Sequence, residues 1–575
     1  MKRSKSSPPA PVVAPPRWRW SWSWGPPLLL AIVILLTFAD SFDDGLVLDN
    51  HTKIGDDSRI QAVTPANLYL IFTQNYWWPT YESDLYRPLT SLTYLVNYSV
   101  LESGDNPLGY HLVNTLLHWL NAWLVFLLAA RFLQHRLLAL LLTVAFAVHP
   151  LTIEAVTNIV GRADLLAGLF MLAGLELHSR LRTGSSAEPL LSRLALGLCA
   201  VLAVFSKESG VVLIALMLLD DLSNLPAIAG STGEKIRAWL RFIPWKNYAA
   251  VLPAIIALFV ARYELLKNSP ISFQMATDNP TALSGFWTRE MTAVKVLGYY
   301  LELTFWPARL SCDYSYNQIP AFGWSWSGAD LDAWLGLAMV ALLSVAALAS
   351  WRRLPAVFFF LGFAFITLLP VSNLVITIGT IMGERFMYLP LVGILGALAA
   401  WGEWLAARPA LARLASSPLA RRLGGGLAVV IIVALATRTV VRNRDWYDNT
   451  RLWESAMRVS PDSFKVYKGL ATSLSGDPTK LDERIALALE GLAICDAGPL
   501  PLEHSPNGLL CDLAHYYAQK GDQFRQAGKT SAATTWYKKA DEIVERAIKA
   551  DRAVNAAARR DSLARGMKAE NYHDV

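Results

Sequence analysis

Long apolar runs dominate residues 26–441 of this chain, and they decide what it can fold into. Of its 575 residues, 54% are hydrophobic and 17% are charged. A soluble fold has no interior large enough for this much apolar surface, so the sequence predicts an all-α, polytopic membrane protein. Eleven candidate spans fall at 26–39, 110–130, 137–149, 164–178, 190–205, 209–219, 247–262, 330–350, 355–370, 387–405 and 425–441.

The distribution of basic residues predicts the orientation of these spans. Residues 1–25 hold a basic cluster followed by alternating tryptophans, which is typical of a retained signal anchor with a cytoplasmic tail. Every second connection is then basic and cytoplasmic, which explains the net charge of +6 without a nucleic-acid partner. Segment 290–306 is assigned to an interfacial or re-entrant helix, because a twelfth span would reverse the later orientation. Loops 41–109 and 263–329 and everything after Arg442 therefore share the outer side.

The C-terminal part, 445–575, changes abruptly to a polar composition. Alanine and aromatic residues recur there at helical spacing, which predicts a soluble domain of paired helices like those of tetratricopeptide repeats. The stretch Gly498–Pro506 interrupts the period, so only two or three helical hairpins are expected. Cys495 and Cys511 lie close enough in sequence to suggest a disulfide, which the sequence leaves open.

Two adjacent carboxylates, Asp43 and Asp44, directly follow the first apolar run. An acid pair at the membrane surface can supply the general base for a substrate carried by a lipid. The alternative is a solvated loop that caps the next helix.

Polar residues recur at intervals of three or four in the second apolar run, at His111, Asn114, His118 and Asn121. This spacing places all four on one helix face, which predicts a polar site inside the bundle. Two histidines alone do not hold a metal, and the sequence identifies no third ligand, so no metal site is predicted.

Charged pairs recur at the outer boundary, in Arg162 with Asp164 and in Lys207 with Glu208. They are either structural ion pairs or cations that bind a phosphate. Arg385 is the only cation of its loop, and it is the strongest single phosphate candidate.

Short motifs in a fixed order now identify a family resemblance. They are YRPL, YHLVNTLLH, HPLTIEAVTNIVGRADLL, SKESG, LSCDYS, LPVSNL, GERFMYLP and RDWYDNTRLW, preceded by the acid pair and followed by helical repeats. In this order they resemble the transmembrane and tetratricopeptide-repeat-containing (TMTC-like) proteins, which are multi-spanning glycosyltransferases of the GT-C class. The resemblance implies a GT-C-like domain at 26–442 and an extracytoplasmic repeat domain at 445–575.

The resemblance implies transfer of a sugar, mannose in the better-known members, from a polyprenyl-phosphate carrier to a Ser or Thr hydroxyl of a protein. Asp43 is then predicted to be the base, and Asp44 to orient it or to contact the acceptor or the sugar. Three cations are predicted to bind the leaving phosphate, in the order Arg385, Arg162 and Lys207. His111 and His118 are predicted to add hydrogen bonds to the phosphate or the sugar. A further set of polar residues is predicted to contact the substrate or to organise the outer loops. They are Arg87, Asn114, His149, Glu154, Asp164, Glu208, Asp313, Tyr314 and Glu384.

Other functions stay open at this level. The acceptor can instead be a lipid or a glycan, and two further classes are a secondary transporter and a membrane-anchored docking protein. The outer clustering of charge argues against both of the latter. The sequence also leaves open the need for a divalent cation. The compact repeat domain and the loops rich in Ala, Arg and Leu favour a bacterial plasma membrane, with the active site on its outer face.

Overall fold

The computed structural model describes residues 24–564, except 81–82, 226–231, 268–275, 327, 499–500 and 502–503. The described residues are mostly helical and form no β-strand, so the predicted all-α fold is confirmed. The predicted cytoplasmic tail, 1–25, lies almost entirely outside the described residues, and the outer segment 263–329 lies partly outside them.

Each of the eleven apolar runs forms a helix of the bundle. These helices are α1 (Gly25–Phe38), α4 (Pro107–Phe132), α5 (Arg136–Ala147), α7 (Arg162–Arg182), α8 (Pro189–Ser206), α9 (Leu213–Ser223), α11 (Trp245–Leu266), α13 (Ala329–Ser350), α14 (Pro355–Leu368), α15 (Pro390–Ala406) and α17 (Pro418–Asn443).

Length and composition allow fewer of these helices to cross a bilayer alone. Among the described residues, six helices meet both criteria, namely α1, α4, α8, α11, α13 and α17. Helix α5 and the segment Pro150–Val156 meet them only when taken together, and they are bent by 56° as in a broken span or a re-entrant loop. α14 and α15 are apolar but shorter. α7 carries acidic and basic side chains, and these charged residues lower its mean hydropathy. They pair inside the protein. Eleven spans therefore stay a prediction.

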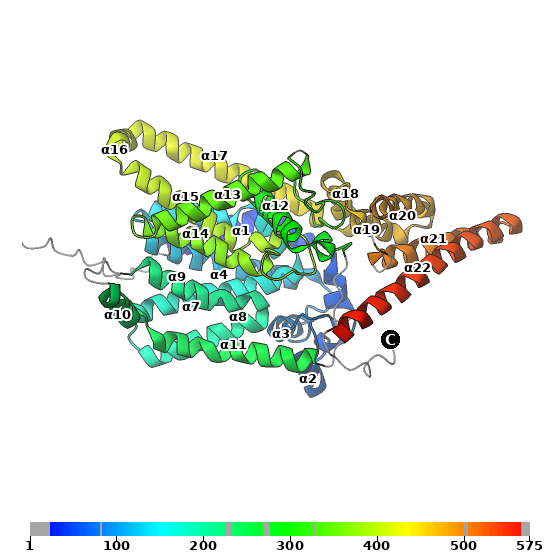
Figure 1. The fold of residues 1–575 in the computed structure, drawn as a ribbon, viewed down its shortest axis with the longest axis horizontal. Helices are drawn as coiled ribbons and strands as arrows, with labels where there is room; N and C mark the ends of the chain where they lie inside the picture. The colour runs from blue at the N-terminus through cyan, green and yellow to red at the C-terminus, as the bar shows by residue number, and fades with distance from the viewer. Residues whose placement is uncertain are drawn as a thin grey trace, which may run out of the picture.

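The loops divide between the two ends of the helical bundle (Figure 1). One end carries the basic amphipathic helices α10 (Thr232–Phe242) and α16 (Pro409–Ser416). The opposite end carries α2 (Pro65–Thr73) and α3 (Pro88–Leu95) of the first outer loop. Two further helices are α6 (Ile153–Val156) and α12 (Phe286–Phe305), and α12 is not among the helices apolar enough to span. We call the end with α2 and α3 the outer end, and the other the inner end.

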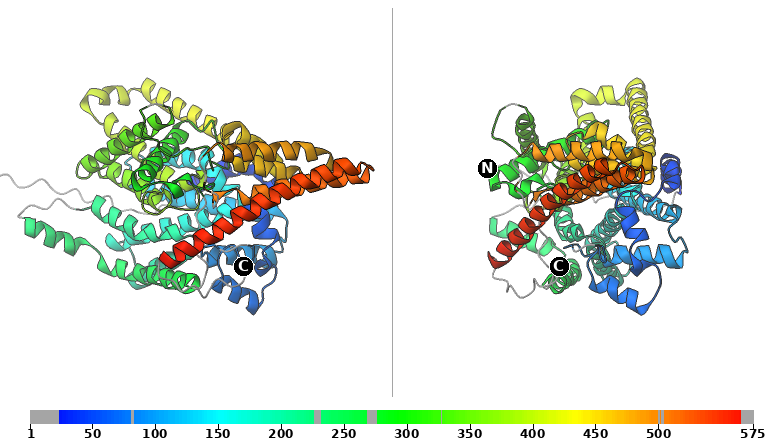
Figure 2. Two further views of the ribbon diagram at one scale, coloured as in Figure 1. Left: turned by 45° about the vertical axis from the view of Figure 1, so that its right-hand side comes forward. Right: turned by 90° about the vertical axis from the view of Figure 1, so that its right-hand side faces the viewer.

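Five helices form the C-terminal domain, and each packs against the next along the chain. They are α18 (Asn449–Val459), α19 (Phe464–Ser473), α20 (Leu481–Asp496), α21 (Asn507–Gln526) and α22 (Thr530–Ala564). The predicted interruption lies between α20 and α21, and these helices lie across the outer end of the bundle (Figure 2). Cys495 is buried, Cys511 is exposed, and both thiols are free.

The C-terminal domain is docked on the outer segments before and after α12. Tyr316 of this loop packs into the apolar core of the domain, and its carbonyl oxygen accepts a hydrogen bond from the Phe464 amide at 3.0 Å. The Ser463 hydroxyl donates to Asp313 at 2.6 Å, and Lys465 lies 2.8 Å from Asp278. Because these contacts combine apolar burial with ion pairing, the domain is fixed beside the outer loops.

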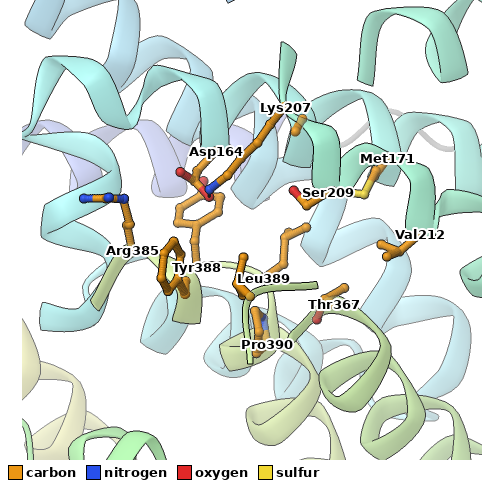
Figure 3. Close-up of a pocket in the computed structure, with 13 residues that line it drawn as sticks. Asp164, Met171, Lys207, Ser209, Val212, Thr367, Arg385, Tyr388, Leu389 and Pro390 are labelled. Atoms are coloured by element: carbon orange, nitrogen blue, oxygen red, sulfur yellow. Dashed lines mark hydrogen bonds and ion pairs between the residues drawn. The ribbon is translucent and has the colours of Figure 1, made fainter. Parts of the chain in front are cut away.

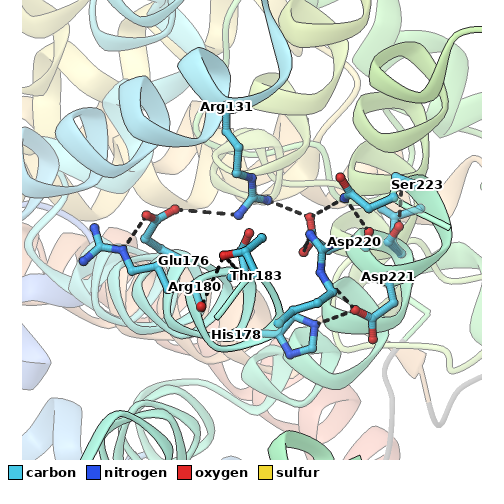
Figure 4. Close-up of polar contacts among 12 residues, drawn as sticks. Arg131, Glu176, His178, Arg180, Thr183, Asp220, Asp221 and Ser223 are labelled. Carbon is cyan, nitrogen blue, oxygen red and sulfur yellow. Dashed lines mark hydrogen bonds and ion pairs between the residues drawn. The ribbon is translucent and has the colours of Figure 1, made fainter. Parts of the chain in front are cut away.

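A buried charge network holds the inner end together (Figure 4). Asp220 and Asp221 of α9 are fully buried. Asp220 accepts hydrogen bonds from Arg131 of α4 at 2.8 Å and from Arg182 of α7 at 3.0 Å. His178 Nε2 lies 3.0 Å from Asp221. The network therefore ties α4, α7 and α9 together at the end opposite the acid pair.

This network gives a stability prediction. We expect Asp220→Ala to destabilise the protein by roughly 3–5 kcal/mol, because Arg131 and Arg182 lose the buried carboxylate between them. Thermal unfolding of the purified protein in detergent measures the change. The matched control is Glu188→Ala, since Glu188 is an exposed acid. Equal melting temperatures for the two variants would contradict a role of the network in holding the bundle.

Candidate active site

The acid pair lies where the first span ends and the first outer loop begins. Helix α1 continues into a 3₁₀ turn, Ala39–Asp43, and the Gly45 amide then donates to the carbonyl oxygen of Tyr447 at 3.0 Å. Asp43 is exposed, whereas Asp44 is 3% exposed. The Asp44 Oδ2 atom has no hydrogen-bond partner among the described residues. The two carboxylates are thus unequal: Asp43 is accessible to a substrate, and Asp44 lies inside the protein.

Burial determines the protonation of Asp44. Loss of solvation, reinforced by the carboxylates of Asp40 and Asp43, raises the pKa of Asp44 to about 8. Near neutral pH this carboxyl group therefore holds a proton and is not available as a general base.

The raised pKa of Asp44 predicts how stability changes with pH. Since the folded-state pKa exceeds that of the unfolded chain, stability falls as pH rises from about 4 to about 8. Asp44→Asn removes this ionisation at nearly constant shape. We expect the melting temperature of Asp44→Asn, measured in detergent, to rise relative to that of the wild type as the pH increases from 5 to about 8. Parallel pH profiles would contradict the assignment.

Two of the predicted phosphate ligands lie at one pocket. Arg385 and Lys207 line a small pocket of about 30 Å³ between α7, the segment 207–212 that follows α8, the end of α14 and the start of α15 (Figure 3). Asp164, Ser209 and Tyr388 add polar groups, and the remaining wall is mainly apolar, formed by Ala167, Met171, Val212, Thr367, Val371, Phe386, Leu389 and Pro390. The pocket thus joins cations to an apolar wall, which suits a phosphate attached to a lipid chain.

Each of these cations is paired with a carboxylate from another segment. The Lys207 ammonium donates to Asp164 at 2.5 Å, and Arg385 pairs with Glu154, which also accepts from the Arg385 amide at 2.9 Å. The interpretations that paired Arg162 with Asp164 and Lys207 with Glu208 were wrong, because the folded chain brings other partners closer. The Arg385 side chain is 34% exposed, so one face stays open to a ligand.

The third predicted phosphate ligand lies elsewhere. Arg162 is fully buried, and its guanidinium donates to Asn114 at 2.8 Å and to the Tyr110 carbonyl oxygen at 3.1 Å. The Tyr94 ring stacks on the guanidinium at 4.8 Å. Arg162 therefore joins α3, α4 and α7, and it does not line the pocket.

The predicted polar face of α4 is buried as expected, but much of it contacts protein. His111, Asn114, His118 and Asn121 are each at most 1% exposed. His118 Nε2 lies 3.0 Å from the carbonyl oxygen of Ala147 and donates to it, which leaves Nδ1 to accept from Tyr388 at 2.9 Å. Both ring nitrogens of His111 are buried and have no hydrogen-bond partner among the described residues. His118 therefore supports the segment of Tyr388, which lines the pocket.

Another group of predicted residues organises the loops. Glu208 accepts from Arg87 at 3.0 Å and from the Tyr86 amide at 3.0 Å, which ties the first outer loop to the end of α8. The His149 ring caps the turn that follows α5, because its Nδ1 accepts from the Leu151 amide at 3.2 Å.

The loop after α12 is tied to the segment that carries Arg385. Tyr314 and the Ser311 amide donate to Glu384 at 2.8 and 2.7 Å. Burial raises the pKa of Glu384 to about 7, although Arg442 opposes the shift. Asp313 accepts from Ser463 of the C-terminal domain. Glu384 therefore attaches the segment of its neighbour, Arg385, to the loop that follows α12.

Sequence reasoning missed Asp49. Its carboxylate lies within electrostatic range of Arg385, Lys465 and Asp313. No motif marks Asp49. Its one signal is its position six residues after Asp43, in the same outer loop.

The described residues contain one group of three or more metal-ligating side chains close enough to share an ion, His178, Asp220 and Asp221 at the inner end. The Asp220 oxygens already accept from two arginines, and Asp221 accepts from Tyr248 at 2.6 Å. An ion there would compete with these cations, so the cluster serves the structure.

Comparison with known proteins gives relatives of consistent description. The chain is 30% identical to "Protein O-mannosyl-transferase Tmtc1" of Drosophila melanogaster, over 78% of this chain and 59% of the relative. It is 26% identical to human "Protein O-mannosyl-transferase TMTC3", over 78% of this chain and 49% of the relative. It is 29% identical to mouse "Protein O-mannosyl-transferase TMTC4", over 81% and 65%. The chain thus spans about half to two thirds of the length of these curated relatives.

No family model matches the chain. No solved structure gives a significant match.

Proposed function

Since the chain is a TMTC-like protein, we propose that it is a GT-C-class glycosyltransferase that moves mannose from a polyprenyl-phosphate carrier to Ser or Thr hydroxyls of proteins. The transfer takes place on the outer face of the membrane, in a bacterial plasma membrane. The observation that carries this proposal is the pocket of Arg385 and Lys207, because it combines cations with an apolar wall at a bundle of apolar helices.

The chemistry is a single displacement at the anomeric carbon. The acceptor oxygen forms a bond to this carbon while the bond from the carbon to the phosphate oxygen breaks, which inverts the configuration. Asp43 takes the proton of the hydroxyl, and the electron pair leaves with polyprenyl phosphate. The exposure of Asp43 and the burial of Asp44 support this division of roles.

The leaving phosphate gains negative charge as the bond breaks, so nearby fixed cations lower the barrier. Arg385 and Lys207 are the cations at the pocket, and their carboxylate partners keep both in place before substrate arrives. The apolar side chains below them suit the first isoprene units. Arg162 supports this region from outside the pocket.

A protein acceptor is supported by the docked C-terminal domain. Its first helices contact the loop that carries Asp313, and its start also contacts the segment directly after the acid pair, since the Leu48 amide donates to Asn449 and the Gly45 amide to the Tyr447 carbonyl oxygen. A polypeptide that binds this domain would be held close to the outer loops, which raises its local concentration at the site.

Reconstituted enzyme tests the proposal directly. We expect the wild type in liposomes to transfer mannose from polyprenyl-phosphate mannose to Ser/Thr peptides, and to leave the matched Ala peptides and nucleotide-linked mannose unused. Mass spectrometry of the peptides measures the transfer. Transfer from a nucleotide sugar alone would overturn the donor assignment. Transfer to a lipid or glycan in place of peptide would retain the donor and overturn the acceptor.

A further inference from the structure

The Ser209 hydroxyl lines the pocket and has no hydrogen-bond partner among the described residues. The other polar side chains of the wall are Asp164, Lys207, Thr367, Arg385 and Tyr388. The three charged groups among them are held in ion pairs. The Tyr388 hydroxyl donates to His118 at 2.9 Å, and the Thr367 hydroxyl donates to the carbonyl oxygen of Phe363 at 2.7 Å. Ser209 therefore offers the pocket a hydroxyl that the fold itself does not use.

The turn that carries Ser209 is fixed on both sides of this residue. It is the 3₁₀ turn that directly follows α8. On one side, Glu208 accepts a hydrogen bond from Arg87 at 3.0 Å. On the other side, a Cβ atom at Gly210 would lie 2.5 Å from the carbonyl carbon of Ala203, so the turn packs directly against the end of α8. Ser209 therefore has a fixed place in the pocket wall before a ligand binds.

Ser209 lies at the border between the charged and the apolar part of the pocket. Its neighbours in the wall are Lys207 on one side and the apolar side chains of Met171 and Val212 on the other (Figure 3). A ligand that contacts both parts of the wall therefore passes the Ser209 hydroxyl.

The two cations of the pocket meet at one aromatic ring. The Lys207 ammonium lies 5.2 Å from the centroid of the Phe386 ring, and the Arg385 guanidinium lies 5.3 Å from the same centroid. Two positive charges held this close together favour an anion between them. The charged part of the pocket thus suits a phosphate, and Ser209 lies where the apolar wall begins.

From this placement we infer that the Ser209 hydroxyl donates a hydrogen bond to the phosphate of the polyprenyl carrier. This phosphate joins a charged group to an apolar chain, and the border at which Ser209 lies has the same two parts. A serine hydroxyl can donate to a phosphate oxygen, and such a bond is strengthened by the charge of the acceptor. The inference rests on the proposed function, and it makes Ser209 a binding residue for the sugar donor.

Binding of the carrier with and without its phosphate tests the inference. The purified full-length protein in detergent is titrated with polyprenyl phosphate and with polyprenol, the same lipid without a phosphate. We expect Ser209→Ala to weaken the binding of polyprenyl phosphate about 10- to 100-fold, because a hydrogen bond to a charged group is lost. Binding of polyprenol should not change. Ser209→Thr keeps the hydroxyl and should keep most of the affinity for polyprenyl phosphate.

The matched control is Ser206→Ala. The Ser206 hydroxyl belongs to the same segment, but it donates to the carbonyl oxygen of Leu202 at 2.6 Å and does not line the pocket. This variant should bind both lipids as the wild type does.

Three results would overturn the inference and leave the proposed function intact. They are an unchanged affinity of Ser209→Ala for polyprenyl phosphate, an equal loss of affinity for polyprenol, and a loss in Ser209→Thr as large as that in Ser209→Ala. A wild type that binds polyprenol as tightly as polyprenyl phosphate would overturn the phosphate-linked carrier, and with it both proposals.

Discussion

Asp43→Asn is expected to lower kcat for mannose transfer by roughly 10²- to 10⁴-fold, with little change in donor binding. The amide keeps the size of the carboxylate but does not take a proton from the acceptor hydroxyl. Because Asp43 is exposed, the substitution breaks no buried contact, and the melting temperature should stay close to that of the wild type. Single-turnover transfer to peptide measures the rate of the chemical step. Binding of labelled donor measures the affinity for the donor.

The comparison with Asp44→Asn separates the two acids. Asp44 is buried and holds a proton near neutral pH, so its conversion to Asn should reduce the rate much less than Asp43→Asn does. Asp105→Asn is the matched control, since Asp105 is an exposed acid of the same outer loop. A larger loss of kcat from Asp44→Asn than from Asp43→Asn would identify Asp44, and not Asp43, as the general base.

The sequence predicted the all-α bundle, the buried row on α4 and the interruption after α20 because each depends on local periodicity. It did not predict ion-pair partners, since these depend on how distant segments meet. Lys207 stands beside Glu208 in sequence but pairs with Asp164, and Glu208 pairs with Arg87. Arg385 likewise pairs with Glu154, 231 residues away in the sequence, and no single-sequence pattern encodes that contact.

The ion pair of Lys207 and Asp164 offers the sharper test of the phosphate site. Lys207→Gln alone leaves Asp164 without its cation in a nearly buried place, so it harms folding whether or not Lys207 binds substrate. The double variant Lys207→Gln/Asp164→Asn removes both charges and relieves that cost. We expect its melting temperature to return toward the wild-type value while kcat stays about 10²- to 10³-fold low, because the leaving phosphate has lost a fixed cation.

The control is the Lys520–Asp482 pair of the C-terminal domain, which is closed at 2.8 Å and lies away from the pocket. Lys520→Gln/Asp482→Asn should leave both stability and transfer unchanged. If neutralising Lys207 and Asp164 restored transfer together with stability, the pair would only join α7 to the end of α8, and Arg385 would be the sole cation at the leaving phosphate. If transfer stays low while the fold recovers, the charge of Lys207 acts on the reaction itself.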